Sequence, residues 1–120
     1  ILPRPVKLRV IPGAIFRSSK PAIFGVDVLE GTLKPGVTLK RGNKIIGSVK
    51  EIQSEGRTIH QAIKGERVAI SIEEAIVGRN VFENDILISD LSKEDVERLK
   101  EVFDYLREDE KNLLVELSES

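Results

Sequence analysis

The sequence contains no cysteine, and histidine occurs once, as His60. Without cysteine the chain forms no disulfide, thiolate metal site or cysteine nucleophile, and this composition suits a reducing compartment. His60 lies within an expected strand, and the lone acids near it do not make a Ser–His–Asp triad or a metal site, so we expect an ordinary surface or partly buried side chain. The sequence also has no run of about 18 apolar residues, which excludes a membrane-spanning helix.

The motifs of nucleotide and acid–base chemistry are also missing. There is no phosphate loop with Gly-Lys-Ser or Gly-Lys-Thr and no glycine-rich nucleotide fingerprint. Glu73 and Glu74 are adjacent, so in a strand their side chains point to opposite faces and cannot work as a carboxylate pair. We therefore expect no catalytic residues, no metal, no cofactor and no GTP hydrolysis by this chain.

Methionine is the third absence. An open reading frame begins with methionine, whereas this chain of 120 residues begins at Ile1 and contains none. We therefore expect a domain taken from a longer protein. Its length and its 40 % apolar residues suit one soluble globular domain with one core.

Charge is unevenly distributed along the chain. Residues 1–72 carry 13 Lys and Arg against 5 Asp and Glu, a net charge of +8. Residues 73–120 carry 6 against 15, a net charge of −9, and the two parts sum to −1. These charges could simply lie on surfaces that face water. Their segregation along the chain, however, favours a nucleic-acid partner for residues 1–72.

Short alternating segments fill the first 90 residues and predict strands. Three of them have an apolar face, and "RTIHQAI" predicts another strand with Ile63 on one face and Ala62 on the other. Pro12-Gly13 predicts a turn, residues 40–44 predict a hairpin loop, and "DILIS" is the last expected strand. Many short strands separated by glycine and proline predict a small barrel or a sandwich. The three apolar faces are Val6, Leu8 and Val10; Phe24, Val26 and Val28; and Val68, Ile70 and Ile72.

The segment "KIIGSVKEIQ" changes faces partway along. Ile45, Gly47 and Val49 share one face in strict alternation, but Ile52 joins them only if the chain slips by one residue. Bulges and glycines give this kind of slip, and a sheet that closes into a barrel needs them in order to bend. We therefore predict a bulge near Lys50 that directs this side chain outward.

After Ser89 the spacing of apolar residues becomes helical. Ser92 followed by Asp95 predicts a capping box that begins a helix, with Val96, Val102 and others on its apolar face. "REDEKNLLVELSES" predicts a second, shorter helix. Neither helix is expected to be stable without packing against other parts of the protein.

Four segments, taken together, resemble one family. They are "IPGAIFRSSKPAIFGVDVLEGTLKPGVTL", "IIGSVKEIQ", "AIKGERVAISIE" and "GRNVFENDILISDLSKEDVERLKEVF". Nearly the whole chain is similar to the last domain of archaeal and eukaryotic translation initiation factor 5B, a relative of bacterial initiation factor 2. The resemblance implies a mainly β fold: a closed antiparallel β-barrel over residues 1–90, like the second domain of translational elongation factors, followed by two C-terminal α-helices over residues 91–120.

The resemblance also implies a function. Domains of this family hold the aminoacylated acceptor end of initiator methionyl-tRNA, bind initiation factor 1A through the C-terminal helices, and promote ribosomal subunit joining. The implied partners are therefore initiator methionyl-tRNA, initiation factor 1A, the ribosome and the GTPase core of the same polypeptide. The implied location is the cytoplasm, with no membrane contact. A protein-docking scaffold with no direct tRNA contact is the alternative.

The resemblance also suggests where the tRNA site lies. In the bacterial relatives the aminoacyl end is bound by the two segments that match residues 48–53 and 64–70 of this chain. Lys50 keeps the positive charge that the family has at its position, whereas Glu51 replaces an arginine of the bacterial pattern. We expect Lys50 and Arg67 to meet at one barrel rim, beside an apolar shelf for the terminal adenosine. The expected acceptor-end residues are Lys50, Ile52, Lys64, Arg67, Val68, Ala69, Arg17 and Lys20.

The helical segment has its own expected site. In this family the helices receive the tail of initiation factor 1A, which fits apolar anchors entering a groove. The expected walls of this groove are Leu99, Phe103, Leu106, Leu113 and Leu117.

Overall fold

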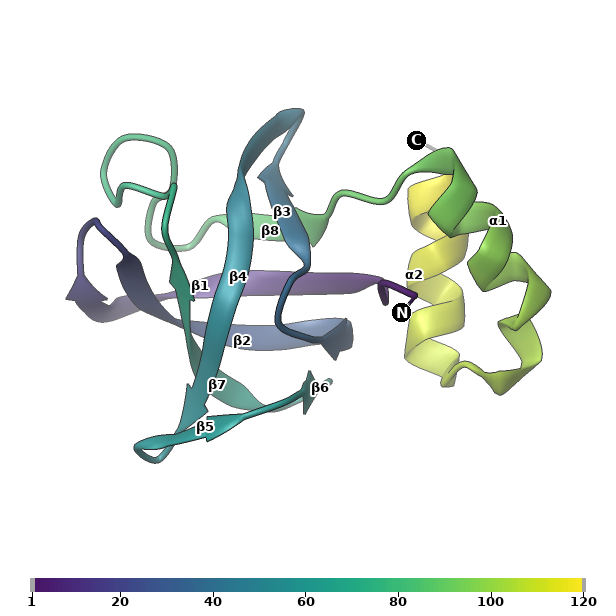
Figure 1. The fold of residues 1–120 in the computed structure, drawn as a ribbon, viewed down its shortest axis with the longest axis horizontal. Coiled ribbons are helices and arrows are strands. Elements are labelled where there is room, and N and C mark those ends of the chain that lie inside the picture. The colour runs from purple at the N-terminus through teal and green to yellow at the C-terminus, as the bar shows by residue number, and fades with distance from the viewer. Residues whose placement is uncertain (1, 120) are drawn as a thin grey trace.

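The computed structural model describes residues 2–119 and shows a β-barrel with a helical pair at one end (Figure 1). Strand β8 ends at Ser89 and the first helix begins at Lys93. The strands are β1 (Val6–Arg17), β2 (Ala22–Leu33), β3 (Thr38–Arg41), β4 (Lys44–Ser54), β5 (Arg57–Ile59), β6 (Ala62–Ile63), β7 (Arg67–Ile72) and β8 (Ile86–Ser89).

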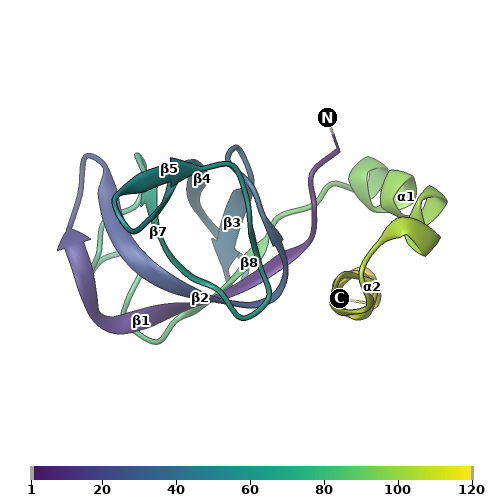
Figure 2. The same ribbon diagram turned by 90° about the horizontal axis from the view of Figure 1, so that it is seen from below.

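Six of these strands close the barrel. The hydrogen-bonded order is β1-β8-β3-β4-β7-β2, and β2 pairs again with β1, all antiparallel (Figure 2). The short β5 pairs with β4, and β6 pairs with the end of β2. Closure leaves the six strands without a free edge. The predicted fold, a closed antiparallel barrel followed by two helices, is confirmed.

The predicted bulge in β4 is present. The β4–β7 register shifts between Val49 and Glu51, so Lys50 is the extra residue, and Val49 and Ile52 are both buried. The prediction for Ile45 is wrong, because this side chain is 59 % exposed and Ile46 is buried instead. A second register shift, opposite Leu39 and Lys40 of β3, accounts for this exchange.

Two other local predictions need correction. Pro12-Gly13 is not a turn between strands: β1 continues through it, with an irregular register against β2 in which Gly13 has φ +79°. The expected strand over residues 57–63 is interrupted at His60 and Gln61. Ala62 is fully buried and Ile63 is 37 % exposed, because the interruption resets the alternation.

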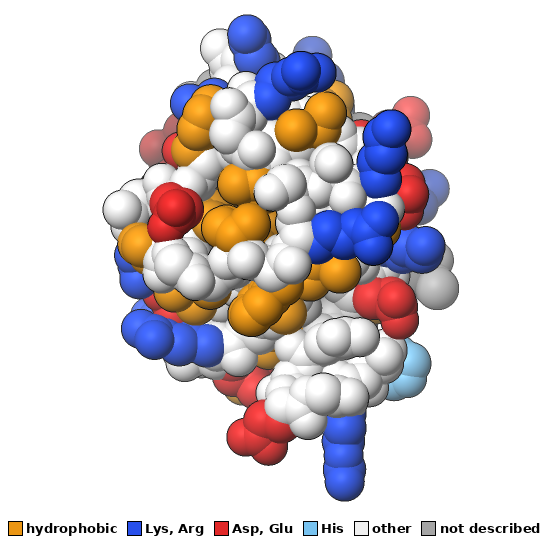
Figure 3. All heavy atoms as spheres, turned by 90° about the vertical axis from the view of Figure 1, so that its left-hand side faces the viewer, with side chains coloured by type: hydrophobic (Ala, Val, Ile, Leu, Met, Phe, Trp, Pro, Cys, Tyr) orange, Lys and Arg blue, Asp and Glu red, His pale blue; other side chains and the backbone are white. Residues whose placement is uncertain are grey.

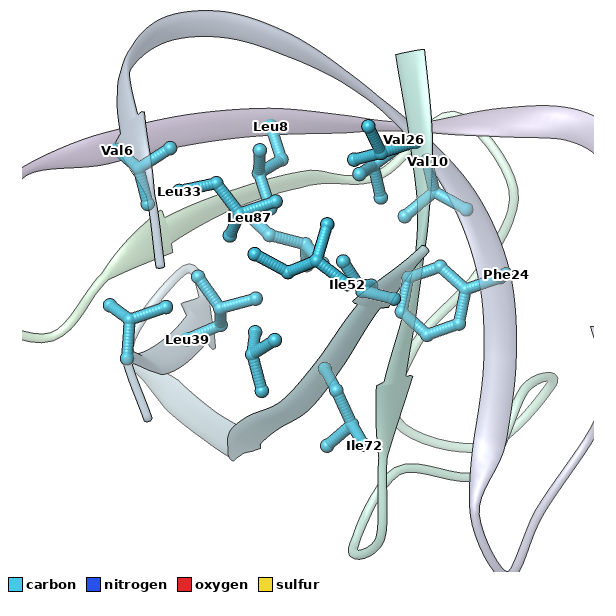
Figure 4. Close-up of a cluster of buried hydrophobic side chains, with 14 of the residues drawn as sticks. Val6, Leu8, Val10, Phe24, Val26, Leu33, Leu39, Ile52, Ile72 and Leu87 are labelled. Carbon is cyan, nitrogen blue, oxygen red and sulfur yellow. The ribbon is translucent and has the colours of Figure 1, made fainter. Parts of the chain in front are cut away.

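The barrel core consists of the inward residues of all six strands (Figure 4). Phe24, the largest buried side chain, lies among aliphatic residues from facing strands. Burying a large apolar side chain contributes about 1.5–3 kcal/mol, so this core is the main source of stability. The faces predicted from alternation are confirmed as buried: Val6, Leu8, Val10, Phe24, Val26, Val28, Val68, Ile70 and Ile72.

The helical pair comprises α1 (Lys93–Glu101), one turn of 3-10 helix (Phe103–Tyr105) and α2 (Glu108–Ser118). The predicted capping box is confirmed: the Asp95 backbone N–H donates to Ser92 Oγ over 3.0 Å, and the Ser92 N–H donates to the Asp95 carboxylate over 3.2 Å. Helix α1 ends earlier than its apolar spacing suggests, since Val102 caps it. No helix among residues 2–119 has the length and apolar character to cross a bilayer.

Helix α2 packs on the barrel through β1 and β2, and a buried carboxylate fixes it there. Glu110, with no exposed surface, accepts hydrogen bonds from Arg4 Nε over 2.8 Å and Arg4 NH2 over 2.6 Å. It also accepts from Thr32 Oγ1 of β2 over 2.8 Å and from the Arg107 backbone N–H over 3.1 Å. Burial by itself raises the pKa of the Glu110 carboxyl, but these hydrogen bonds outweigh burial and lower that pKa below its ordinary value.

The two ends of the barrel therefore differ. The helices cover one end, and the loop between β1 and β2 lies at the other (Figure 1). Figure 3 shows this second end: hydrophobic side chains lie in the middle of the face, and Lys and Arg side chains surround much of it, interrupted by a few acidic groups.

Candidate nucleic-acid interface

A pocket of about 80 Å³ lies on the outside of the barrel, where β2, β4 and β7 run side by side. We call it the β4–β7 pocket. It combines a lysine, a carboxylate, an amide and a hydroxyl with an apolar surface. Its lining residues are Pro21, Ile23, Lys50, Glu51, Gln53, Ala69, Ile70 and Ser71.

The strand register explains why the pocket forms here. On β7 the side chains of Val68 and Ile70 are buried in the core, so Ala69 and Ser71 face outward. Both are small and leave a depression between longer neighbours. Across the ladder, Gln53 of β4 pairs with Ala69, and Glu51 pairs with Ser71.

The bulge in β4 sets the charges of the pocket. Lys50 is turned outward, with its Nζ 3.7 Å from a carboxylate oxygen of Glu73. Both side chains are more than half exposed, so this ion pair contributes little and leaves the lysine able to contact another anion. The next residue, Glu51, is anchored by its backbone N–H, which donates to Ser71 Oγ over 3.2 Å.

The pocket brings together part of the predicted tRNA site. Lys50 and Ala69 both line it. Lys20 directly precedes Pro21, another lining residue, and Arg17 donates from Nε to the Ser19 carbonyl in the same loop over 2.9 Å. Of the predicted cationic residues, Lys50 therefore belongs to the pocket and Lys20 to the loop that leads into it, and Arg17 is the last residue of β1 before that loop.

Two of the residues predicted for an apolar shelf lie in the barrel core instead. Ile52 has no exposed surface and Val68 is 6 % exposed, so both belong to the barrel core. Figure 4 shows Ile52 among the core side chains. The apolar surface of the pocket comes instead from Pro21 and Ile23, which sequence reasoning missed, together with Ala69 and Ile70. Only the register between β2 and β7 brings Ile23 opposite Ser71.

Arg67 does not meet Lys50 at one rim. It lies four residues before Ser71 on β7, which corresponds to roughly 13 Å at the usual rise of a strand. Its Nε is 2.7 Å from Asp27 Oδ1, while Arg9 NH2 is 2.6 Å from the other oxygen of the same carboxylate. Lys64 lies in the turn before β7, is exposed and does not line the pocket.

The helical pair forms a separate groove with the chain's N-terminal segment. We call this the helix groove: a cavity of about 260 Å³ lined by Leu2, Arg4, Lys34, Leu99, Val102, Tyr105 and Leu106. Tyr105 is 89 % exposed at its edge. A neighbouring cavity of about 380 Å³ shares Leu2, Arg4 and Lys34 and continues along the barrel to Val37.

Only part of the predicted partner site lines this groove. Leu99 and Leu106 form its floor, and Phe103 packs against the same apolar cluster. Leu113 has no exposed surface and Leu117 is half-buried, and neither lines the groove. Leu2 and Val102 were missed, since Leu2 precedes the first strand by several residues and its proximity to the helices depends on the fold.

Among residues 2–119 no three His, Cys, Asp or Glu side chains converge in a way that would hold a metal ion. His60 is exposed and lies in the interruption between β5 and β6.

Comparison with known proteins agrees with the fold. The family model for elongation factor Tu domain 4 matches residues 4–88, which is the barrel. A probable translation initiation factor IF-2 of Methanopyrus kandleri is 50 % identical over 98 % of this chain, and its counterpart in Pyrobaculum calidifontis is 45 % identical over 96 %. In both cases the chain spans 20 % of the relative's length.

A solved structure extends the similarity to the helices. The crystal structure of GDP-bound aIF5B from Aeropyrum pernix matches 98 % of this chain with a TM-score of 0.93 and 35 % identity, and the match covers 20 % of that protein. The helical pair beyond residue 88 is therefore shared with archaeal initiation factors, although the barrel model alone does not include it. The chain belongs to the elongation factor Tu domain 4 family and corresponds to domain IV of the archaeal aIF5B/IF-2 initiation factors.

Proposed function

We propose that this domain serves translation initiation by holding the aminoacylated acceptor end of initiator tRNA in the β4–β7 pocket. The observation that carries the proposal is the pocket itself, in which Lys50 stands beside an apolar surface at a bulge. A tRNA end offers phosphates for a cation and a base and an amino-acid side chain for an apolar surface. Lys20, in the loop before β2, and Arg17, the last residue of β1, would contact the acceptor strand.

Membership of the initiation-factor group supports this proposal, because the similar proteins are translation initiation factors. The domain would be a non-catalytic part of a larger GTP-binding factor acting on the ribosome in the cytoplasm. Its contribution would be positional: the barrel presents the pocket, and the remaining polypeptide supplies nucleotide binding.

Tests of the tRNA site need variants that remain folded. Replacing Lys50 with alanine should weaken binding of methionylated initiator tRNA and flatten its salt dependence by up to about one phosphate contact. Ala69→Asp should also weaken binding, because it puts a negative charge into the pocket. Lys44→Ala, at the other end of β4, is the matched control. If all three folded variants bind methionylated initiator tRNA with the same affinity as the parent chain, the pocket is not the tRNA site.

A second candidate function is supported by the helix groove. Its Leu2, Val102 and Leu106 offer an apolar surface, and Arg4 and Lys34 offer positive charge at its margin. This combination suits an extended or helical segment with apolar anchors and acidic residues, and we propose the tail of initiation factor 1A as that segment.

The groove is best tested from its edge, since the floor residues hold the helices together. Val102→Glu should reduce binding of an initiation factor 1A tail peptide at least tenfold, whereas Val115→Glu, at an exposed position of α2, should not. If neither variant affects peptide binding, the groove is not the docking site. If the peptide binds but tRNA never does, the scaffold alternative without direct tRNA contact is favoured.

A further inference from the structure

Glu51 is an unusual side chain for a surface that binds nucleic acid. It lines the β4–β7 pocket, yet no basic side chain among residues 2–119 forms an ion pair with its carboxylate. Its side-chain contact is a long hydrogen bond of 3.5 Å from Thr58 Oγ1 of β5. Other acids of the barrel differ, because Glu73 pairs with Lys50 and Asp27 pairs with two arginines.

The backbone of Glu51 is nevertheless well fixed. Its N–H is bound to Ser71 Oγ, and it follows directly after the bulge residue of a strand that is paired on both sides. The point from which the Glu51 side chain leaves the strand is therefore defined, and its carboxylate, bound among the described residues only by the long Thr58 hydrogen bond, has hydrogen-bonding capacity to spare. Facing a phosphate it would be repulsive and would weaken binding. A ligand that gains from it must carry a positive charge.

An aminoacyl ester is such a ligand. It has phosphodiesters at one end and an α-amino group at the other, and that amino group is cationic at mildly acidic to neutral pH. Lys50 and Glu51 are consecutive residues with opposite charges, and they line one pocket together with an apolar surface. The arrangement complements the three parts of an aminoacyl end: phosphate, ammonium and side chain.

We propose that the Glu51 carboxylate accepts a hydrogen bond from the free α-ammonium of the bound amino acid. The domain would thereby select aminoacyl ends with an unblocked amino group over N-acylated ones. This inference rests on the proposed tRNA function and names Glu51 as a specificity-determining residue of that site. Gln53, the other polar neighbour on β4, is neutral and would not distinguish the two forms by charge.

The experiment compares three ligands: initiator tRNA carrying methionine, the same tRNA carrying N-acetylmethionine, and the deacylated tRNA. Affinities are measured at about pH 6, where α-amino groups are protonated and carboxylates are ionised. A charge-assisted hydrogen bond in a partly exposed pocket should favour the free amine by roughly tenfold. Glu51→Gln keeps the shape of the side chain and the backbone hydrogen bond but removes the charge. In this variant the ratio of affinities for methionyl-tRNA and N-acetylmethionyl-tRNA should fall to about one.

Glu55→Gln is the matched control. It makes the same change of charge in the turn between β4 and β5, outside the pocket, and should retain the tenfold preference. Deacylated tRNA should bind the two variants with similar affinity, because each has lost one negative charge. Thermal melts check that both variants are folded.

Failure of the inference can be distinguished from failure of the proposed function. If the parent chain binds tRNA in a manner sensitive to Lys50→Ala but does not prefer the free amine, or if Glu51→Gln keeps the preference, the role of Glu51 is refuted and the site stands. If no form of tRNA binds at all, both proposals are overturned.

Discussion

Replacing Arg4 with alanine tests how the helical pair is held on the barrel. Glu110 is fully buried, and Arg4 satisfies it with two hydrogen bonds of 2.8 and 2.6 Å. Removing one partner of a buried ion pair costs about 3–5 kcal/mol when the other charge is left unpaired. In the Arg4→Ala variant Glu110 keeps a second, longer ion pair, with Arg107 NH1 at 3.8 Å, which lowers this cost. Here Arg4 is 26 % exposed, and the hydroxyl of Thr32 and the N–H of Arg107 remain. We therefore expect a loss of about 2–3 kcal/mol in the free energy of unfolding.

Urea unfolding at pH 7, followed by far-UV circular dichroism, measures this loss. The control is Lys7→Ala, which removes another contact between barrel and α2, the 2.9 Å ion pair with Glu116 at the surface. A surface pair contributes about 0–1 kcal/mol. In the double variant Arg4→Ala/Glu110→Gln, loss of the charge should recover at least about 1 kcal/mol relative to additive effects. The reasoning is refuted if Arg4→Ala costs no more than Lys7→Ala, or if no coupling is found.

The same pair predicts a dependence on pH. Because the folded state lowers the pKa of Glu110, the carboxylate stabilises the fold fully above the ordinary Glu pKa of about 4.3. This contribution is lost as the pH falls through the lower folded-state pKa. The difference in stability between the parent chain and Arg4→Ala should therefore narrow below about pH 4.

Two further predictions concern the backbone. Gly31 has φ +91°, and a Cβ added there would collide with the Pro5 carbonyl oxygen, so Gly31→Ala should lower the free energy of unfolding by more than about 3 kcal/mol. Gly36 has nearly the same φ, +92°, but lies in open space, so in the same urea assay Gly36→Ala should cost only the strain of a side chain at positive φ, about 1–2 kcal/mol. Equal losses would contradict the steric argument. Ser92→Ala removes the N-cap of α1 and should cost about 1 kcal/mol, seen as a lower thermal midpoint, whereas Ser92→Asp should be nearly neutral.

Alternation in the sequence was sufficient to predict strands with one buried face, but it fitted a small barrel and a sandwich equally well. The closed barrel was predicted from the family resemblance. The face change around Lys50 also predicted the bulge correctly, since Val49 and Ile52 could be buried together only if one residue was extra. The same bulge places Ile52 in the core, so predicting Ile52 as a shelf residue was inconsistent with predicting the bulge. Val68 was likewise predicted both on the buried face of its strand and in the shelf, and only the first prediction is correct.

Other features depend on contacts that a sequence does not specify. The pairing of Arg67 with Asp27 requires the register of β7 against β2, and the place of Ile23 in the pocket requires the same register. Glu110 lies in an acidic helix that looks solvated, and its burial depends on Arg4, more than a hundred residues away in the chain. The early end of α1 likewise reflects the turn that lets α2 reach the barrel.

The central claim is that the β4–β7 pocket holds the aminoacylated end of tRNA. Backbone NMR of the chain, titrated with methionylated initiator tRNA, tests this most directly. The account predicts that the largest shifts of amide signals occur at Lys50, Glu51, Ala69 and Ser71, that they diminish with deacylated tRNA, and that the signals of α1 do not move. Shifts confined to the helices, or identical shifts with aminoacylated and deacylated tRNA, would contradict it.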